Sequence, residues 1–574
     1  MRDALVTRST PPLGTDETRE LAARRPSGRE SGCVSRNWAP APRRQPERKR
    51  TDASARRPYR HHGRARSPNA PCLALGLLLV LSGACGSPTS RAFSSDDPVG
   101  LRIGYAEPHA TSADYGPGFA FVLSLLSDAR LVTTAANGRA RAGLAERWEA
   151  SPDGRTWRFT LKPRLRFHDG SPITAATVVR GLSSRLEAPA PLYPGLRDIT
   201  KVEVLSATEF VIRLREPSWL LLEALSFEAV RGNRTAGGGA GPFRLERQEA
   251  TAATLRRVDG NHRGSPAIDR ITMRAYPRPR AAWAALLRGE IDLVYDVAPE
   301  ALPFIERARQ VQTRSFLRPY VYALGFNLRH PLLQHHDVRL ALNYAVDRET
   351  VIEQAMAGRG QAASGHISPE HWAYDPGVTP FPYRPDRAAA LLAKANGDRE
   401  RPAFTCLVPS RDPRLERLAL LLQRQLIEVG VDMDIEVLPM SAMHARLARG
   451  QFDAYLLDVA AGKDLNFPYW FWRSGDEVPL AASGYTAADA ALDRLRYAQT
   501  VTSAEIAIHQ FQRILHDDPP AVFLCWGETT RALSTRFTMA EGFEGDLLSM
   551  IADAHRASSQ SGADGNPVGT ASSP

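Results

Sequence analysis

The 574-residue chain contains few cysteines, and their spacing indicates neither a metal site nor a redox site. There are five: Cys33, Cys72, Cys85, Cys406 and Cys525. They include no Cys-x-x-Cys pair, and no histidine follows at a zinc-binding distance. We therefore expect no resident metal or cofactor. Cys406 and Cys525 could form a disulfide in an oxidising compartment, but two buried thiols in separate strands are the favoured interpretation.

The sequence also lacks the motifs of the common enzyme classes. It contains no Gly-x-Ser-x-Gly, no His-Glu-x-x-His and no phosphate-binding loop. These absences argue against an enzyme. A transcription regulator that uses the chain as a sensor would need a helix-turn-helix before the folded body, and residues 1–100 offer none.

An excess of positive charge is missing from most of the chain. The formal net charge is +10, but residues 1–84 hold 17 Lys and Arg against 7 Asp and Glu. The remaining residues hold 56 of each kind. Because the body of the chain is formally neutral, we expect no nucleic-acid partner.

No apolar run is long enough to span a bilayer, which takes about 20 residues. Residues 73–81 form a nine-residue apolar run with arginines upstream, which has the length of a signal-peptide core. It ends in Leu81-Ser82-Gly83-Ala84-Cys85, which resembles the lipobox of bacterial lipoproteins. This resemblance implies that Cys85 is lipidated and becomes the first residue. An ordinary signal peptide is the alternative.

Residues 1–60 are rich in Arg, Pro, Ser and Ala and have no periodic apolar face, so we expect them to be disordered. Met1 lies far upstream for a signal peptide. We therefore expect translation to start downstream of it, near Val34.

Residues 143–182 are the most informative stretch. Apolar and polar residues alternate over residues 157–161, which predicts a half-buried strand. Pro and Gly predict turns at residues 151–154 and 168–172. Thr174 is placed to cap the helix that follows.

The letters of this stretch resemble the signature region of the bacterial extracellular solute-binding proteins of family 5, the peptide- and nickel-binding subunits of ABC importers. The family pattern is "LAe-W-e-s-DG-t-y-F-L-r-F-hDG-t-ltA-DV", and nearly all of it is present. The chain departs from the pattern at Ala176-Thr177, where the family has two acidic residues. This change removes a favourable interaction with the helix dipole.

The resemblance covers residues 101–537 through further motifs in the family's order. Residues 239–244 resemble its Gly-Thr-Gly-Pro-Tyr turn, and residues 282–292 resemble its "ALl-GeiD" segment. Residues 337–348 resemble "DvRvRqAlnyAiDRe", and we expect Asp337 to cap the helix that begins there.

The resemblance implies an α/β chain with the two-lobed periplasmic-binding-protein fold, type II and similar to cluster C, with a subdomain inserted in lobe one. Two chain crossings would join the lobes. The expected organisation is a basic leader (1–70), a lipoprotein signal and lipobox (71–85), a linker (86–99), lobe one (100–326) with the insertion at about 128–234, lobe two (327–515), a return to lobe one (516–555) and a disordered tail (556–574).

Such proteins close two lobes on a ligand, so polar anchors and aromatic rings are expected in the cleft. The best aromatic cluster spans residues 467–472. Either Trp470 or Trp472 stacks on the ligand, or the cluster is a packed core helix; both interpretations stay open. Further candidates for the cleft are Tyr105, Asn327, Trp372, Tyr374 and Tyr485.

Peptide-binding members hold the ligand's α-ammonium with an aspartate just past a strand. Here Val459 stands where the family has tryptophan, and Gly462 aligns with the aspartate. Asp464, two positions on, is the candidate replacement, and Asp458 is another. A carboxylate facing a cation is a strong contact. Without one, a neutral or differently charged ligand is favoured.

Nickel is the family's other ligand class, and His335, His336 and His371 are available. Adjacent histidines point in different directions, so a surface turn at His335-His336 is the favoured interpretation. We assign no metal ligand.

These patterns predict a lipid-anchored, extracytoplasmic binding protein that is not an enzyme. It would capture an oligopeptide or dipeptide and deliver it to the membrane subunits of an ABC permease. A non-peptide solute, a nickel chelate or a sensor that reuses the fold is the alternative. We expect a monomer, attached to the membrane through its lipid.

Overall fold

The computed structural model describes residues 99–106, 118–188, 193–232, 238–397, 401–410, 412–461, 463–475, 482–538, 551 and 555–556. The predicted leader, the lipobox with Cys85, most of the linker and nearly all of the tail lie outside these residues, as does Gly462. All of the described residues belong to one compact unit. Among the described residues, no helix combines the length and the apolar composition that a membrane crossing requires.

An 11-stranded mixed sheet is the largest element of the described chain. β15 (Gly360–Ala362) lies off the main path and pairs with β19. In order across the sheet, the other strands are β10 (Phe243–Gln248), β11 (Ala252–Arg257), β12 (Arg270–Tyr276), β1 (Gly100–Ala106), β13 (Leu293–Val297), β19 (Ala521–Ser534), β14 (Val311–Phe326), β18 (Ala454–Ala460), β16 (Ala403–Pro409) and β17 (Asp432–Leu438).

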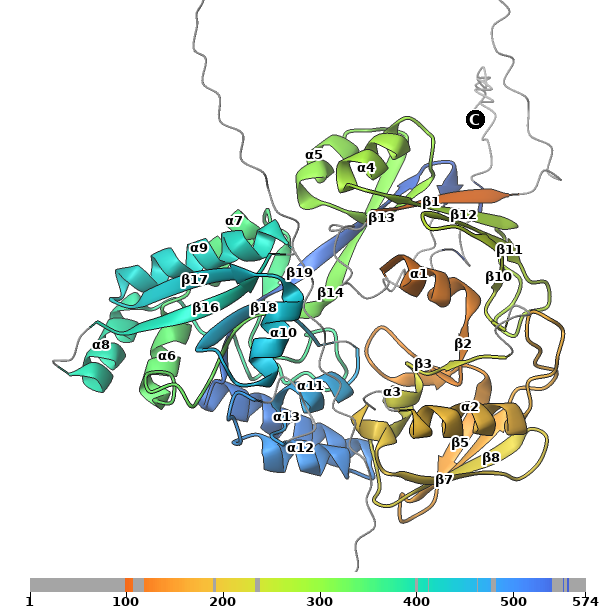
Figure 1. Cartoon of the computed structure of the whole chain (residues 1–574), viewed down its shortest axis with the longest axis horizontal. Coiled ribbons are helices and arrows are strands. Elements are labelled where there is room, and N and C mark those ends of the chain that lie inside the picture. Colours follow the sequence, from red (N-terminus) through yellow and green to blue (C-terminus); the bar gives the residue numbers. More distant parts are fainter. Residues whose placement is uncertain are drawn as a thin grey trace, which may run out of the picture. The chain divides into compact units, whose positions relative to one another are not determined.

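Two long strands, β14 and β19, join the two halves of this sheet (Figure 1). They run antiparallel from the pair Val311–Ser534 to the pair Gly325–Ala521. The later part of β19 pairs with β13, and the later part of β14 pairs with β18. The register between them shifts between Leu317 and Val321. Pro319 lies in this break and has no backbone N–H to donate, so the ladder is weakest there.

We call lobe one the described residues 99–127, 238–317 and 528–538, and lobe two residues 321–526. Lobe one carries three helices: α1 (Gly118–Ser127), α4 (Pro279–Leu287) and α5 (Leu302–Ile305). Lobe two carries eight: α6 (His336–Tyr344), α7 (Arg348–Ala355), α8 (Pro385–Asn396), α9 (Pro413–Glu428), α10 (Met440–Ala448), α11 (Asn466–Trp472), α12 (Asp489–Arg496) and α13 (Val501–Asp517). These counts refer to the described part of the chain.

The segment between α1 and β10 forms a separate layer, which we call the inserted subdomain (described residues 128–232). Its four-stranded sheet has the order β5 (Ala145–Ala150), β6 (Thr156–Leu161), β8 (Glu209–Leu214) and β7 (Ile199–Val204). Its other elements are β2 (Ala129–Arg130), β3 (Val132–Thr134), β4 (Ala140–Ala142), α2 (Ala175–Glu187), the 3-10 turn η1 (Pro194–Leu196), α3 (Leu221–Leu225) and β9 (Ala229–Val230). The subdomain has its own apolar core around Phe159 and Phe210, whose rings stack 5.2 Å apart.

The structure confirms three local predictions made from the sequence. The alternation along β6 is confirmed, because Phe159 and Leu161 are buried while Arg158 is exposed. Thr174 caps α2 as predicted, since its side chain accepts a hydrogen bond from the Thr177 N–H. Cys406 and Cys525 are free and buried, so the interpretation as thiols is confirmed over the disulfide.

The predicted cap at Asp337 is wrong. The N-cap of α6 is His335, which makes no capping bond through its side chain. Asp337 instead lies in the first turn of the helix, and its carboxylate pairs with Lys394 of α8 at 2.7 Å. A carboxylate in the first turn still complements the helix dipole, which is why the sequence pattern did not distinguish the two positions.

Candidate functional site

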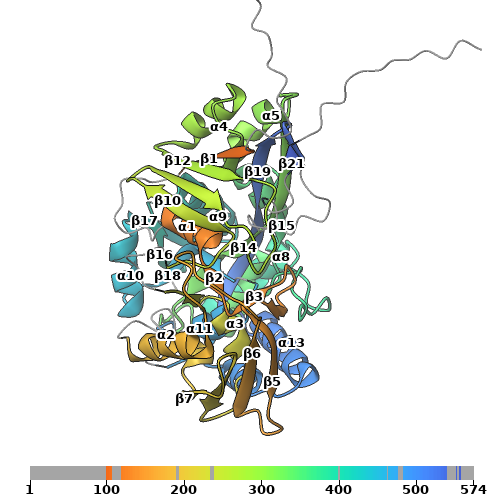
Figure 2. The same cartoon turned by 90° about the vertical axis from the view of Figure 1, so that its right-hand side faces the viewer.

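The inserted subdomain and lobe two meet along α3 and α11, which lie side by side in Figure 2. Asn466, which begins α11, accepts a hydrogen bond from the Gly195 N–H and donates one to the Leu220 carbonyl. Leu220 is fully buried and packs into the apolar core of lobe two. The two bodies are therefore in direct contact across what the sequence predicts to be the ligand cleft.

Two carboxyl groups are buried in this interface. Glu223 in α3 accepts a hydrogen bond from the Leu465 N–H at 2.6 Å. One oxygen of Asp464 accepts from the Asn466 N–H at 2.9 Å. The second oxygen of Asp464 is buried and has no hydrogen-bond partner among the described residues. Glu223 belongs to the inserted subdomain and Asp464 to lobe two. Their side chains are only 5% and 3% exposed, so both carboxyl groups are shielded from water.

Burial changes how readily these groups ionise. Desolvation raises the pKa of Asp464 to about 7, against hydrogen bonds from the Asn466 region that lower it. Desolvation, together with the nearby Asp464 charge, raises the pKa of Glu223 well above its ordinary value. Two like charges in a low-dielectric place repel each other, so the pair is stabilised by a shared proton or by an added cation.

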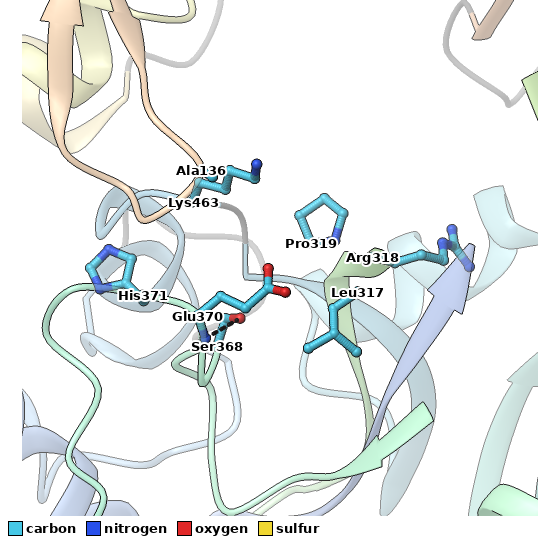
Figure 3. A pocket seen from close by; sticks show the side chains of 8 residues that line it. All are labelled: Ala136, Leu317, Arg318, Pro319, Ser368, Glu370, His371 and Lys463. Atoms are coloured by element: carbon cyan, nitrogen blue, oxygen red, sulfur yellow. Dashed lines mark hydrogen bonds between the residues drawn. The ribbon is translucent and has the colours of Figure 1, made fainter. Parts of the chain in front are cut away.

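A small hollow, drawn in Figure 3, is lined in part by Lys463, the residue before Asp464. Its volume of about 10 Å³ is enough for roughly one water molecule. Lys463 and Glu370 reach toward it from different sides, whereas Arg318 extends away from it (Figure 3). The lining residues are Ala136 at the tip between β3 and β4, Leu317, Arg318 and Pro319 at the break in β14, Ser368, Glu370 and His371 in the loop after β15, and Lys463.

His371 carries a buried hydrogen-bond donor at the tip of the β3–β4 hairpin, where its Nε2 lies against Gly138. Its Nδ1 accepts from the Ala373 N–H at 3.2 Å, so the ring proton resides on Nε2. Burial, with a smaller contribution from Arg139, lowers the pKa of His371 to about 4, so the ring is neutral at physiological pH. Its Nε2 is buried and has no hydrogen-bond partner among the described residues. It is therefore suited to an acceptor oxygen.

The hollow lies beside a second contact between the subdomain and lobe two. The Trp372 N–H donates to the Asn137 carbonyl at 2.9 Å. The Arg139 guanidinium stacks over the Trp372 ring at 4.5 Å from its centroid. The tip of the β3–β4 hairpin thus rests on the loop that carries His371.

Comparison with known proteins identifies this arrangement of two lobes, two crossing strands and an inserted subdomain. The family model "Bacterial extracellular solute-binding proteins, family 5 Middle" matches residues 139–478, which is more than half of the chain. The chain belongs to this family. The predicted fold class is thereby confirmed: the chain has the mixed α/β, two-lobed fold of the periplasmic binding proteins.

Family members in curated collections resemble the chain at moderate identity. A probable D,D-dipeptide-binding periplasmic protein of Escherichia coli (strain K12) is 25% identical over 412 residues, 66% of this chain and 78% of that protein. The nickel-binding periplasmic protein of the same organism is 28% identical over 410 residues, covering 64% and 76%. The solved structure of the oligopeptide-binding protein AppA from Bacillus subtilis, in complex with a nonapeptide, superposes with a TM-score of 0.67 at 21% identity and covers 80% of this chain and 99% of that chain.

The structure places two of the predicted site residues in the core of lobe two. Trp472 is 3% exposed, and its Nε1–H donates to Nδ1 of His366 at 2.6 Å. Tyr485 is equally buried, and its ring meets Trp472 edge to face at 6.2 Å. Both side chains therefore pack as core residues. For Trp472, this is the second of the two interpretations of the aromatic cluster at residues 467–472.

Four other predicted residues lie at or near the interface. Asp464 belongs to the carboxyl pair, and Trp470 faces the inserted subdomain, where its ring lies 5.8 Å from that of Tyr193. Trp372 supports the β3–β4 hairpin tip, as described above. Tyr374 lies two residues on, and its hydroxyl is 3.3 Å from the Ser364 hydroxyl.

The remaining two predicted residues lie elsewhere. Asn327 lines a different, open hollow of about 480 Å³ beside Gly450 and Asp453. Its amide donates to the Phe452 carbonyl at 2.7 Å, which is a structural role at the end of β14. Tyr105 ends β1 in lobe one, where its ring contacts Phe119 and Tyr295.

Glu223 and Tyr193 are not among the site residues predicted from the sequence. Glu223 sits in a short apolar segment, WLLLEAL, where a lone acidic residue is a signal that it has a buried role. Tyr193 carried no such signal, because its contacts are with Phe467 and Trp470, more than 250 positions away. His371 was considered only as a nickel ligand, and the described residues contain no group of three or more metal-ligating side chains around it.

Proposed function

We propose that the protein is the lipid-anchored, substrate-binding component of an ABC importer. It captures an oligopeptide or dipeptide between lobe two and the body formed by lobe one and the inserted subdomain. Closure of the lobes about β14 and β19 then presents the solute to the permease. The protein acts as a monomer and carries out no chemical reaction.

The buried pair of Asp464 and Glu223 is the observation that carries the peptide assignment. An ammonium group between these carboxylates would supply the positive charge that the pair lacks, and its N–H donors would satisfy the free oxygen of Asp464. Asp464 lies two positions after the family's anchor position, and Glu223 of the inserted subdomain adds a second carboxylate.

The other end of a peptide is an acceptor, and two donors lie on the same side of the interface. His371 has a neutral N–H at the β3–β4 hairpin tip, and Lys463, next to Asp464 in the chain, reaches toward the hollow (Figure 3). Acidic and donor groups in neighbouring positions match a zwitterion, with an ammonium at one side and carbonyl or carboxylate oxygens at the other.

The small volume of the hollow supports a hinge motion between the two bodies. Pockets for small ligands enclose about 300–1,000 Å³, far more than the roughly 10 Å³ of the hollow. A peptide therefore enters only when the subdomain and lobe two move apart. The register break at residues 317–321 places the softest part of both crossing strands beside the hollow. Ligand contacts to both bodies would then favour the closed state.

Similar proteins support both peptide and nickel as ligand classes. The similar proteins include a dipeptide-binding, an oligopeptide-binding and a nickel-binding protein. One structural neighbour, from Campylobacter jejuni, holds Ni(L-His), at 20% identity and a TM-score of 0.66. We favour the peptide because the buried carboxyl pair suits an ammonium.

Native mass spectrometry tests the proposal. The protein, purified gently from the bacterial envelope, is expected to retain a bound mass that fragments as a peptide. A retained nickel chelate or a non-peptide solute would overturn the peptide assignment. Thermal-shift screening of the same sample against dipeptides and Ni²⁺ provides an independent readout, in which only the peptides are expected to raise the melting temperature.

A further inference from the structure

Four aromatic rings meet where the inserted subdomain touches α11, and we call them the aromatic quartet: Tyr193, Phe227, Phe467 and Trp470. Tyr193 and Phe227, both from the subdomain, stack on each other at 4.6 Å and 20°. Phe467 and Trp470, both from α11, meet the Tyr193 ring edge to face at 6.3 Å and 5.8 Å. Each body therefore contributes one pair of rings.

The helix α11 separates its aromatic residues by face. Tyr469 and Trp472 are both 3% exposed and belong to the core of lobe two. Phe467 and Trp470, three residues apart on the helix, lie outside every buried core cluster of the described chain and face the subdomain. A helix that packs against a single core needs only one apolar stripe, whereas α11 has a second stripe that faces the subdomain.

The quartet keeps features of a binding surface. Phe227 is 36% exposed although two rings contact it. The Nε1–H of Trp470 is buried without a hydrogen-bond partner among the described residues. Buried indole N–H groups usually have a partner, so this donor is suited to an acceptor that arrives with a ligand.

The quartet is continuous with the carboxyl pair. Asp464 precedes Phe467 by three residues, and Glu223 precedes Phe227 by four. Burial and the charge of Asp464 together raise the pKa of Tyr193 to about 12, which places the phenol in the field of that carboxylate. When the two bodies part, the carboxyl pair and the rings are uncovered together.

We propose that the quartet is a side-chain subsite that selects solutes in which the ammonium group is attached to an aromatic or large apolar side chain. This inference rests on the proposed function and adds its substrate class: peptides whose first residue is Phe, Tyr, Trp or Leu. The carboxyl pair holds the ammonium. The side chain inserts between the Tyr193–Phe227 wall and the Phe467–Trp470 wall, and its edge-to-face contacts replace those that the walls make with each other.

Calorimetric titration of the purified protein with Phe-Ala and Gly-Ala tests the inference. The wild type is expected to bind Phe-Ala at least about tenfold more tightly than Gly-Ala. Phe227→Ala and Trp470→Ala are each expected to bring that ratio below about threefold. Phe304→Ala removes an exposed ring on α5 that lies outside the quartet, and this control should leave the ratio unchanged.

The outcomes separate the inference from the function on which it rests. If the wild type binds both dipeptides with equal affinity, or if neither variant changes the ratio, the subsite is overturned while peptide binding stands. If the wild type binds neither dipeptide, the dipeptide part of the proposed function is overturned and the subsite with it. Should Trp470→Ala fail to fold by circular dichroism, the more exposed Phe227→Ala decides the result.

Discussion

Arg496 and Asp198 form an ion pair that joins lobe two to the inserted subdomain. Nε and Nη2 of Arg496 both donate to Oδ2 of Asp198, at 3.0 Å and 2.8 Å. The side chains are only 11% and 5% exposed, and Nη1 of Arg496 also donates to the Tyr469 hydroxyl at 2.9 Å. The interface that holds the carboxyl pair is thus braced by a shielded charge pair, 298 positions apart in sequence.

Replacing Asp198 with asparagine is expected to destabilise the protein strongly. The substitution leaves the Arg496 guanidinium buried without its counter-charge, which typically costs about 3–5 kcal/mol. Chemical denaturation monitored by circular dichroism measures the loss. Glu216→Gln is the matched control, since Glu216 pairs with Arg155 on the surface and its loss should be nearly undetectable. Equal effects of the two substitutions would contradict the bracing role.

Trp472 and Trp470 are expected to respond differently to truncation. Trp472→Ala removes a core ring and leaves the Nδ1 of His366 without a donor, so the free energy of unfolding should fall by about 3–5 kcal/mol. Trp470→Ala should cost less stability and should weaken binding of a Phe-first dipeptide by about 1–3 kcal/mol. Unfolding curves and peptide titrations of both variants measure the loss of stability and the loss of affinity separately. A reversed pattern would place Trp472, rather than Trp470, at the ligand.

The affinity for a peptide is expected to rise with pH between about 5.5 and 7.5. Only the ionised carboxylate pairs with an ammonium, and burial in the interface raises the pKa of Asp464 to about 7. Below that value, each pH unit should change affinity by up to about tenfold, with proton release on binding. Above pH 8 the affinity should fall, because a peptide's α-amino group loses its proton at about 7.7–8.0. Calorimetry in buffers of different ionisation enthalpy would detect the released protons, and Asp464→Asn should flatten the profile.

The stability of the ligand-free protein is expected to show the opposite trend. A carboxyl whose pKa is raised by folding binds more protons in the folded state than in the unfolded state. Its stabilising contribution is therefore complete below the unfolded pKa of about 4 and is lost as pH rises through about 7. The melting temperature should thus decrease from pH 5.5 to pH 8 in the wild type, and the decrease should be smaller in Asp464→Asn. An unchanged slope would show that Asp464 does not control the pH dependence of stability.

Cys85 is expected to hold the protein on the membrane. Cys85→Ser removes the acceptor for the lipid, so the protein should move from the membrane fraction to the soluble fraction after cell lysis. Immunoblotting of the two fractions measures the change, and Cys72→Ser, which lies directly before the apolar run at residues 73–81, is the control. Retention of Cys85→Ser in the membrane fraction would contradict lipidation.

Much of the fold followed from short-range patterns. The alternation in β6, the Thr174 cap and the burial of Cys406 and Cys525 are each decided by a few neighbouring residues, and the structure confirms them. Asp337 failed as a cap because a carboxylate is favourable at several positions of a first helical turn, so that the letter alone does not fix its role.

The candidate site was less accessible to the same reasoning. Asp464 could be proposed from its place after a strand, but its partner Glu223 lies 241 positions earlier, and only the docking of the subdomain brings them together. Likewise, residues 467–472 of α11 form a single aromatic-rich run in the sequence. Their division into a core face and an interface face depends on what packs against each side of the helix.

The most direct test of peptide capture is a calorimetric comparison of Phe-Ala with N-acetyl-Phe-Ala, on the wild type and on Asp464→Asn. The two ligands differ in the ammonium, which acetylation removes. Acetylation is expected to weaken binding to the wild type by about 10- to 100-fold, the worth of a charged hydrogen bond. In Asp464→Asn this difference should largely disappear. Equal affinity of the wild type for both ligands would contradict the account, because the carboxyl pair would then hold no ammonium.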